Sequence, residues 1–264
     1  MNNDLHTFVV LAYKESKYLE NCINSVLNQT VKSNVVIATS TPNDYIKMIA
    51  KKYKLKIIVN EGKKKGIGYD FDFAKQCVNS ELVTIAHQDD IYDNNYTDEV
   101  IKAYKKKPKS IIIFTNYYEI RKEGKVYKNT NLKIKRILLF RLRFHSISKF
   151  KHIKRSALRY GCAICCPSVT FVNNNCPKTI FQSDMKSNID WNAWEKISKE
   201  KGYFYYIKKP LMGHRIYDES TTSKVIKDNG RTKEDYEMFC KFWPKFIAKK
   251  LTKIYQKSEK SNNN

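Results

Sequence analysis

The sequence has few residues that break regular structure and no long apolar segment. Its 264 residues include 8 glycines and 6 prolines, which excludes collagen-like and linker-rich architectures. Runs of aliphatic residues and phenylalanine, such as those at 111–114 and 137–140, are far shorter than the roughly 18 residues of a membrane-spanning helix. The first residues, MNNDLHTFVV, contain neither a basic segment nor a long apolar stretch. We therefore expect no export signal and a cytoplasmic protein.

Acidic residues are also scarce. The chain has 26 Asp and Glu against 50 Lys and Arg, which gives a formal net charge of +24 at pH 7. Between Glu123 and Asp184 there is no acidic residue and there are thirteen basic ones, and after Phe239 seven lysines accompany the single Glu259. Such stretches indicate phosphate groups or an anionic membrane surface as partners, or only a solvated basic face.

Seven cysteines in a chain without an export signal are expected to be reduced thiols. Four of them lie close together in the sequence, at Cys162, Cys165, Cys166 and Cys176. Zinc ribbons pair two well-separated two-cysteine knuckles, and this segment has only one. The spacing therefore favours buried, apolar cysteine side chains in a strand over a zinc site.

The first half of the chain alternates short apolar runs with helical patterns. We expect strands at 7–12, 34–38, 56–60, 82–86 and 110–115. Helices are expected at 18–27, 69–78 and 95–106. A further helix is expected to begin after Thr41, which would be its N-cap. With 42% hydrophobic residues to form a core, this alternation predicts an α/β fold with a mostly parallel sheet flanked by helices.

The second half is less regular and ends in a basic helical extension. We expect a hairpin at 117–127 that turns at Glu123-Gly124, strands at 162–172 and 203–207, and a helix at 190–199. A long terminal helix is expected at 233–256, kinked at Pro244. A boundary near residue 225 divides the chain into a domain over 1–225 and an extension over 226–264. The extension either packs on that domain or forms a homodimer.

The strongest group of chemically active residues is His87-Gln88-Asp89-Asp90, directly after the strand expected at 82–86. In open α/β sheets, ligands bind at the carboxyl ends of strands. Adjacent carboxylates repel each other unless a cation compensates, and hard oxygen ligands favour Mn²⁺ or Mg²⁺ with phosphate completing the shell. The alternative is a pair of exposed acids before the next helix, and this motif alone leaves both interpretations open.

Other segments follow neighbouring strand ends. Tyr13-Lys14-Glu15 follows the first strand, where Glu15 is equally a candidate helix cap, and Thr39-Ser40-Thr41 follows the second. The loop at 62–68 contains three lysines, Lys63 to Lys65, but matches neither a Walker A pattern nor a dinucleotide fingerprint. His214-Arg215 follows another strand: Arg215 suits phosphate and His214 suits a third metal ligand, or Arg215 pairs with Asp218 or Glu219.

Together these segments resemble glycosyltransferase family 2, whose members have the GT-A fold. The resemblance covers about residues 5–223 and is carried, in order, by TFVVLAYKESKYLENCINSVLNQT, NEGKKKGIGYDFDFAKQ, IAHQDD, SNIDWNAW and HRIYDES. It implies that 1–225 is a catalytic domain that transfers a sugar from a nucleotide-sugar donor to an acceptor hydroxyl, with inversion and with Mn²⁺ or Mg²⁺. It also implies a role in bacterial surface polysaccharide or glycolipid synthesis, with a glycan or lipid-linked glycan as acceptor.

The resemblance assigns the donor and metal residues as well. The family's Asp-x-Asp triplet aligns with His87-Gln88-Asp89, so His87 replaces the first Asp and Asp89, with its neighbour Asp90, is expected to hold the metal. The full set expected to bind the nucleotide-sugar is Tyr13, Glu15, Thr39, Asp72, His87, Asp89 and Arg215. Since Thr39-Ser40 stands where relatives carry a base-reading Asp, a preference for uridine does not carry over.

Asp190 aligns with the family's late catalytic acidic residue, which takes the proton of the acceptor hydroxyl. By position alone, a role of Asp190 as N-cap for the helix at 190–199 is favoured, and the resemblance favours catalysis instead. The neighbouring Trp191 and Trp194 are expected to stack on the acceptor sugar, although Trp residues at this spacing more often pack in a core.

The basic segment at 133–155 mixes cations with Ile, Leu and Phe, a pattern typical of a helix on an anionic membrane surface and also of a helix that covers a core. Two rival functions remain. The charge and interleaved aromatic residues favour a nucleic-acid-binding protein, but no nucleic-acid module is recognisable, so we expect no specific nucleic-acid partner. The His87 replacement favours a relative without activity.

Overall fold

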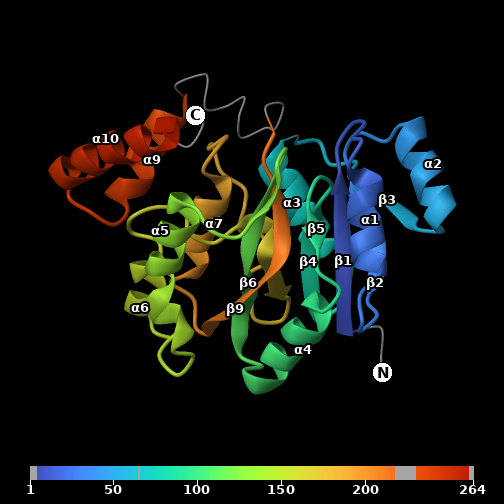
Figure 1. Ribbon diagram of the computed structural model, residues 1–264, viewed down its shortest axis with the longest axis horizontal. Helices are drawn as coiled ribbons and strands as arrows, with labels where there is room; N and C mark the ends of the chain where they lie inside the picture. The colour runs from blue at the N-terminus through green and yellow to red at the C-terminus, as the bar shows by residue number, and fades with distance from the viewer. Residues whose placement is uncertain (1–4, 65, 218–229, 262–264) are drawn as a thin grey trace.

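The computed structural model describes residues 5–64, 66–217 and 230–261. Within these residues, nine strands form one mixed sheet in the order β3-β2-β1-β4-β8-β6-β9-β5, with β7 paired to β6 (Figure 1). The strands are β1 His6–Ala12, β2 Asn34–Thr39, β3 Lys56–Val59, β4 Leu82–His87, β5 Ile91–Tyr92, β6 Ser110–Arg121, β7 Gly124–Val126, β8 Val169–Val172 and β9 Tyr203–Arg215.

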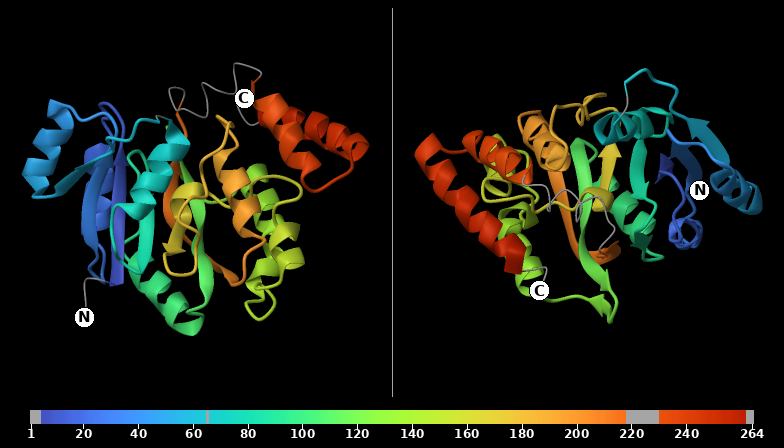
Figure 2. Two further views of the ribbon diagram at one scale, coloured as in Figure 1. Left: turned by 180° about the vertical axis from the view of Figure 1, so that it is seen from behind. Right: turned by 90° about the horizontal axis from the view of Figure 1, so that it is seen from above.

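Helices flank this sheet, and the last two lie at the opposite end of the molecule from α2 (Figures 1 and 2). The α-helices are α1 Leu19–Leu27, α2 Asp44–Tyr53, α3 Ile67–Gln76, α4 Tyr96–Lys106, α5 Thr130–Leu138, α6 Lys151–Ser156, α7 Ile189–Ile197, α9 Gly230–Cys240 and α10 Lys245–Ser261. Short 3-10 turns occur at Phe140–Arg143 and Cys166–Ser168.

The first four strands confirm the predicted parallel α/β arrangement. β1 lies between β2 and β4, with Leu11 opposite His87 and Ala12 opposite Thr39. The central run of β1, including Phe8 and Val10, is fully buried because helices cover both sides of the sheet. Burial of each such side chain contributes about 1.5–3 kcal/mol. The carboxyl ends of β1, β2 and β4 therefore meet at one edge.

The other half of the sheet mixes directions. β8 runs antiparallel to both β4 and β6, β6 is parallel to β9, and the predicted hairpin is confirmed by β6 and β7. The prediction of one strand over 162–172 is wrong, because only Val169–Val172 is a strand. The 3-10 turn before it contains Pro167, which has no N–H to donate to a sheet ladder. β5 pairs with β9, which places the turn after β4 beside His214-Arg215.

Two predicted helix features are also wrong. α2 begins after Asn43, whose side chain accepts a hydrogen bond from the Ile46 N–H at 2.9 Å, so Thr41 is not the cap. The terminal segment is two helices and not one kinked helix, because Pro244 directly precedes α10 and its carbonyl accepts the Ala248 N–H at 3.0 Å.

The C-terminal helices pack on the rest of the chain. Met238, Phe239 and Ala248 are buried in the same hydrophobic cluster as Trp191, whose ring centroid lies 5.2 Å from that of Phe239. The division of the chain at residue 225 and a homodimer both stay predictions. No helix in the described residues is long and apolar enough to cross a bilayer.

Candidate active site

Asp90 anchors the turn between β4 and β5 to β9. It is fully buried and accepts hydrogen bonds from His214 Nδ1 at 3.1 Å and from the Arg215 backbone N–H at 2.8 Å. Burial opposes the charge on each residue, but the attraction between the two charges is stronger. It holds the pKa of Asp90 below its ordinary value and the pKa of His214 above its ordinary value. The two residues therefore form a partly buried ion pair that fixes this turn.

Asp89, the next carboxylate, is partly exposed. Its Oδ2 accepts a hydrogen bond from the Tyr217 hydroxyl at 3.0 Å, and Arg215 Nε donates to its backbone carbonyl at 2.9 Å. Burial, and then the negative charge of Asp90, raise the pKa of the Asp89 carboxyl. A nearby cation would offset both effects, so this carboxylate is suited to a positively charged ligand.

His87 completes a group of potential metal ligands. Its ring stacks on Phe71 at 5.1 Å, and its Nε2 is buried and has no hydrogen-bond partner in the described part of the chain. Burial lowers the pKa of His87, which favours the neutral imidazole that binds metals. His87, Asp89 and Asp90 each offer a ligand atom, and these atoms lie within 4.8 Å of one another. One imidazole nitrogen and two carboxylates fit a divalent cation such as Mn²⁺. The missing hydrogen-bond partner of the buried His87 Nε2 agrees with this assignment.

The structure does not bring His214 into that group. Among the described residues, His87, Asp89 and Asp90 form the one group of three or more possible ligands. The Nδ1 of His214 faces Asp90 instead. The prediction of His214 as third metal ligand is therefore corrected: His214 pairs with Asp90 and is not part of this group.

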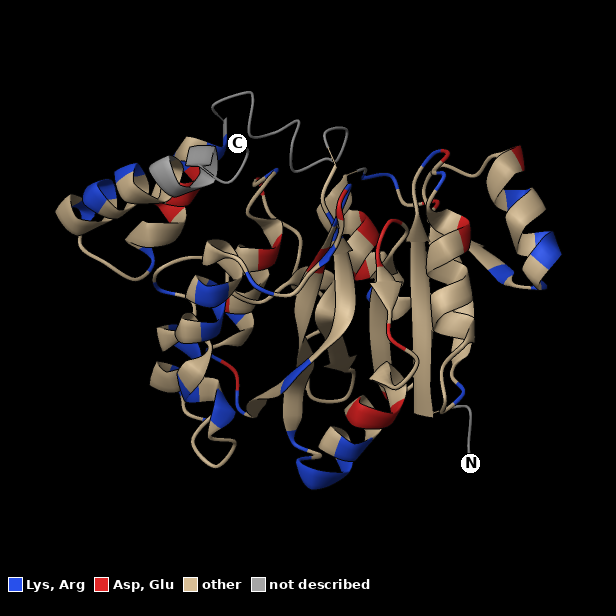
Figure 3. Ribbon diagram, in the orientation of Figure 1, with Lys and Arg blue, Asp and Glu red and all other residues tan. Residues whose placement is uncertain are grey.

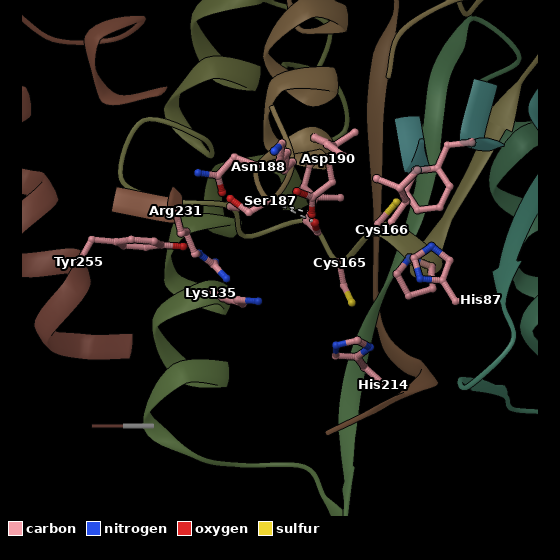
Figure 4. A pocket seen from close by; sticks show the side chains of 17 residues that line it. His87, Lys135, Cys165, Cys166, Ser187, Asn188, Asp190, His214, Arg231 and Tyr255 are labelled. Atoms are coloured by element: carbon pink, nitrogen blue, oxygen red, sulfur yellow. Dashed lines mark hydrogen bonds between the residues drawn. The ribbon is translucent and has the colours of Figure 1, made fainter. Parts of the chain in front are cut away.

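A cavity of about 230 Å³ lies beside this turn. Figure 4 shows His87 on one side of it and Tyr255 and Arg231, from the C-terminal helices, on the other. The charged and titratable side chains that line the cavity are His87, Lys135, Cys162, Cys165, Cys166, Lys186, Asp190, His214, Arg231 and Tyr255. Asp190 is the one carboxylate among the described residues that line it.

Asp190 lies in the first turn of α7. The N-cap position belongs to Asn188, so the alternative role of Asp190 as N-cap is wrong. Its Oδ1 accepts the Trp191 N–H at 2.7 Å, and its Oδ2 accepts the thiol of Cys162 at 3.3 Å. Both bonds fix the carboxylate at the cavity wall, where it is partly exposed.

The expectation that Trp191 and Trp194 stack on an acceptor is corrected by their burial. Both side chains are 0% exposed. Their indole N–H groups donate to the carbonyls of Leu158 at 2.9 Å and Ile164 at 3.3 Å. A stacking surface needs an accessible ring face, so these two residues support the core beneath α7 instead.

Two of the residues expected to bind the nucleotide are also turned away from solvent. Asp72 is 1% exposed and accepts hydrogen bonds from the backbone N–H groups of residues 180, 181 and 182 at 2.8, 3.1 and 3.1 Å. Thr39 is 0% exposed, and its hydroxyl accepts the Thr41 N–H at 3.0 Å. Both side chains stabilise loops, which corrects their assignment as donor contacts.

Other predicted positions do lie at the exposed edge. Tyr13 is 52% exposed, and its backbone N–H and carbonyl both bond to the Gln88 amide at 3.0 Å, which ties the segment after β1 to the turn after β4. Glu15, two residues after Tyr13, is also exposed. Their contact with a nucleotide stays a prediction. Lys65, Asp218 and Glu219 lie outside the described residues.

The cysteines are free thiols. Cys166 and Cys176 are buried, as the sequence favoured, whereas Cys162 and Cys165 are partly exposed and line the cavity with Cys166. Burial, followed by the charge of Asp190, raises the pKa of the Cys162 thiol well above its ordinary value. Cys162 is therefore a neutral hydrogen-bond donor to Asp190.

Two residues important for the cavity were not predicted. Lys135 of α5 reaches it and donates to the Tyr117 hydroxyl at 2.9 Å; although burial opposes its charge, Tyr117 and Cys165 hold its pKa above the ordinary value. Glu234 of α9 accepts the backbone N–H groups of Lys186, Ser187 and Asn188. The mixture of cations and apolar residues in the basic segment 133–155 was a signal for Lys135, but no sequence pattern points to Glu234.

The chain is similar in sequence to known glycosyltransferases. The family model described as glycosyl transferase family 2 matches residues 7–173, more than half of the chain. An uncharacterized glycosyltransferase of Rickettsia typhi is 24% identical over 252 residues, which cover 94% of this chain and 73% of the relative.

Two solved structures share the fold. S. aureus TarS in complex with UDP-GlcNAc has a TM-score of 0.61 and 14% identity, with 94% of this chain and 70% of that chain covered. The mannosyltransferase PcManGT from Pyrobaculum calidifontis, in complex with GDP-Man and Mn²⁺, has a TM-score of 0.56 and 15% identity, with 90% and 63% covered.

Proposed function

Because the chain belongs to glycosyltransferase family 2 and has the GT-A fold, we propose that it transfers a sugar from a nucleotide-sugar to an acceptor hydroxyl, with inversion at the anomeric carbon. The observation that carries this proposal is the cavity that has His87, a member of the possible metal group, on one side and the carboxylate of Asp190 on its wall. A donor diphosphate and an acceptor hydroxyl need these two kinds of group at one place.

The donor side is formed by the turn after β4. We assign His87, Asp89 and Asp90 to a Mn²⁺ or Mg²⁺ ion, since their ligand atoms lie within 4.8 Å of one another. When bound, the ion would neutralise the charge that develops on the leaving diphosphate. Arg215, which is held against this turn by Asp89 and lies 4.1 Å from the ring of Tyr18, is assigned to the same phosphates.

The acceptor side is formed by α7. The acceptor oxygen attacks the anomeric carbon, the bond from that carbon to the diphosphate oxygen breaks, and the hydroxyl proton passes to the Asp190 carboxylate. The bond from the Cys162 thiol to Asp190 Oδ2 holds the carboxylate in position for this transfer. In a single displacement, attack from the face opposite the diphosphate inverts the configuration.

We further propose that the acceptor is a bacterial surface glycan or a lipid-linked glycan and that the protein works at the inner face of the membrane. Support comes from the segment 133–155. Its exposed apolar side chains include Ile137 at 71%, Phe144 at 52% and Phe150 at 46%, and Figure 3 shows Lys and Arg gathered on α5 and α6. Exposed Phe and Ile among cations suit an anionic lipid surface.

Thermal stability with a panel of nucleotide-sugars, with and without Mn²⁺, tests the donor site. A ligand at a hundredfold excess over its Kd adds about 2.7 kcal/mol to the stability of the folded state. We expect a Mn²⁺-dependent shift with one nucleotide, lost in Asp89→Asn and kept in Asp44→Asn, whose side chain is fully exposed. An equal shift in both variants would exclude the turn after β4 as the donor site, and tight polynucleotide binding in place of any shift would favour the nucleic-acid alternative.

A further inference from the structure

A second cavity lies away from the active site, between α6 and the segment that joins α9 to α10. Its volume is about 440 Å³. Four basic or titratable side chains line it, from Lys151, His152, Arg155 and Arg159, together with the rings of Phe242 and Trp243. No acidic side chain is among the described residues that line it, so the lining carries a net positive charge.

Arg159 is the distinctive residue of this cavity. Its guanidinium carbon lies 4.9 Å from the ring centroid of Tyr160 and 5.4 Å from that of Trp243. Within the described chain it has no ion pair, and its Nε is buried without a hydrogen-bond partner. The contacts with two rings hold the guanidinium in place while its charge lacks a counter-ion. A guanidinium held in this way is arranged to bind an anion.

Arg155 shows by contrast what a satisfied arginine looks like in this cavity. It forms an ion pair with Glu195 and donates to the Lys241 carbonyl at 2.6 Å, and its guanidinium lies 4.5 Å from the ring of Phe242. Arg155 therefore joins α6 to α7 and to the end of α9, and supports the wall. Arg159, with Lys151 at the exposed entrance, is left to bind a ligand.

Exposed aromatic rings next to the lining residues indicate where the anion comes from. The ring centroid of Phe150, 46% exposed, lies 5.7 Å from that of His152, and the ring centroid of Tyr160, 41% exposed, lies 5.4 Å from that of Trp243. A soluble phosphate needs no exposed aromatic rings beside it. Aromatic rings next to a cationic recess suit the boundary between lipid headgroups and acyl chains.

We propose that this cavity binds the phosphate group of an anionic phospholipid headgroup, with Arg159 as its main contact and Phe150 and Tyr160 inserted beside it. The ligand class is a phosphate ester, and its source is the membrane surface. The proposal rests on the membrane contact proposed above for 133–155 and makes it specific. The second cavity binds one headgroup, which differs from a diffuse attraction between basic residues and lipid.

The test is binding of the full chain to vesicles of phosphatidylglycerol with phosphatidylcholine, compared with phosphatidylcholine alone. Arg159→Gln is compared with Arg143→Gln, which also removes one arginine charge but lies in the basic segment 133–155, outside the cavity. We expect Arg159→Gln to weaken binding to the anionic vesicles at least tenfold and Arg143→Gln to change it less than twofold. Lys151→Gln, at an exposed position, is expected to weaken binding three- to tenfold. Because this replacement should not affect folding, it tests the cavity even if the Arg159 variant misfolds.

Several results would overturn the proposal. Equal weakening by Arg159→Gln and Arg143→Gln would show diffuse attraction only, and would leave the membrane contact standing. A shift with inorganic phosphate or glycerol phosphate without vesicle binding would assign the cavity to a soluble ligand, and tighter binding of an oligonucleotide than of vesicles would assign it to a nucleic acid. The rate of donor cleavage, measured without vesicles, should be the same in wild type and Arg159→Gln. If wild type itself does not cleave the donor, the transferase proposal fails independently of the result with vesicles.

Discussion

Glu234 connects the C-terminal helices to the active site, and its replacement tests that connection. Its carboxylate accepts the backbone N–H groups of Lys186, Ser187 and Asn188 at 2.6, 2.9 and 2.9 Å, and the Ser187 hydroxyl as well. Burial opposes the charge, but these donors hold the pKa of Glu234 below its ordinary value. The segment that they fix leads directly into α7 and Asp190.

Glu234→Gln keeps the size of the side chain and removes the charge and one acceptor. A hydrogen bond to a charged group contributes about 1.5–3 kcal/mol when it is well buried, and much less where water replaces it. Because Glu234 is partly exposed, we expect a loss of about 2 kcal/mol in the free energy of unfolding, and a Tm lower by about 4–8 °C. Since the released segment precedes Asp190, we expect kcat to fall about tenfold and the Kd of the donor to stay unchanged.

Urea unfolding at several pH values is the assay, with Glu237→Gln, exposed on the same helix, as the matched control. Because the folded-state pKa of Glu234 is depressed, its contribution is present above the unfolded pKa of about 4.3 and is lost as the pH falls through the folded-state value. The difference between wild type and Glu234→Gln should therefore shrink below pH 4. The reasoning is refuted if the two variants have the same stability at pH 7.

Three further predictions follow from the same structure. Asp72→Asn should lower the free energy of unfolding by about 1–3 kcal/mol, measured by urea titration, because three backbone N–H groups lose a charged acceptor; a weaker donor Kd without loss of stability would contradict the loop role. Burial lowers the pKa of His6 to about 3, so below pH 6.5 the unfolded chain binds a proton that the folded chain does not. The free energy of unfolding should therefore fall by about 1.4 kcal/mol for each unit by which the pH decreases below 6.5, and His6→Asn should flatten this dependence. Cys162→Ala should reduce kcat about three- to tenfold at unchanged KM with recovery in Cys162→Ser, and equal rates in both variants would show that the bond to Asp190 Oδ2 is dispensable.

The parts of the fold that could be predicted are those set by local patterns. The continuous apolar runs of β1 and β4 are buried because both faces of the parallel sheet are covered, and such runs are readable in a sequence. The run at 162–172 looked similar, but Pro167 lies in a buried turn, and an apolar pattern does not distinguish a buried turn from a buried strand. Pro244 was expected to bend one helix, whereas tertiary packing uses it to start another.

The active site was predictable at the strand end and not beyond it. The sequence brings His87, Asp89 and Asp90 together in four residues, so their proximity needs no long-range contact. The roles of Asp72 and Thr39 depend on which way each side chain turns, and this is decided by loops far away in the chain. For the same reason Lys135 and Glu234 were missed, since they reach the cavity region only through the packing of α5 and α9.

The most direct test of the central claim is the rate of nucleoside diphosphate release from the donor selected by the thermal panel, in the presence of Mn²⁺. Wild type is compared with Asp190→Asn and with Asp184→Asn, an exposed carboxylate outside the cavity. We predict that Asp190→Asn lowers the rate about 10²–10⁴-fold while donor binding is kept, and that Asp184→Asn matches wild type. Full activity of Asp190→Asn would contradict the assignment of this cavity as the site of sugar transfer.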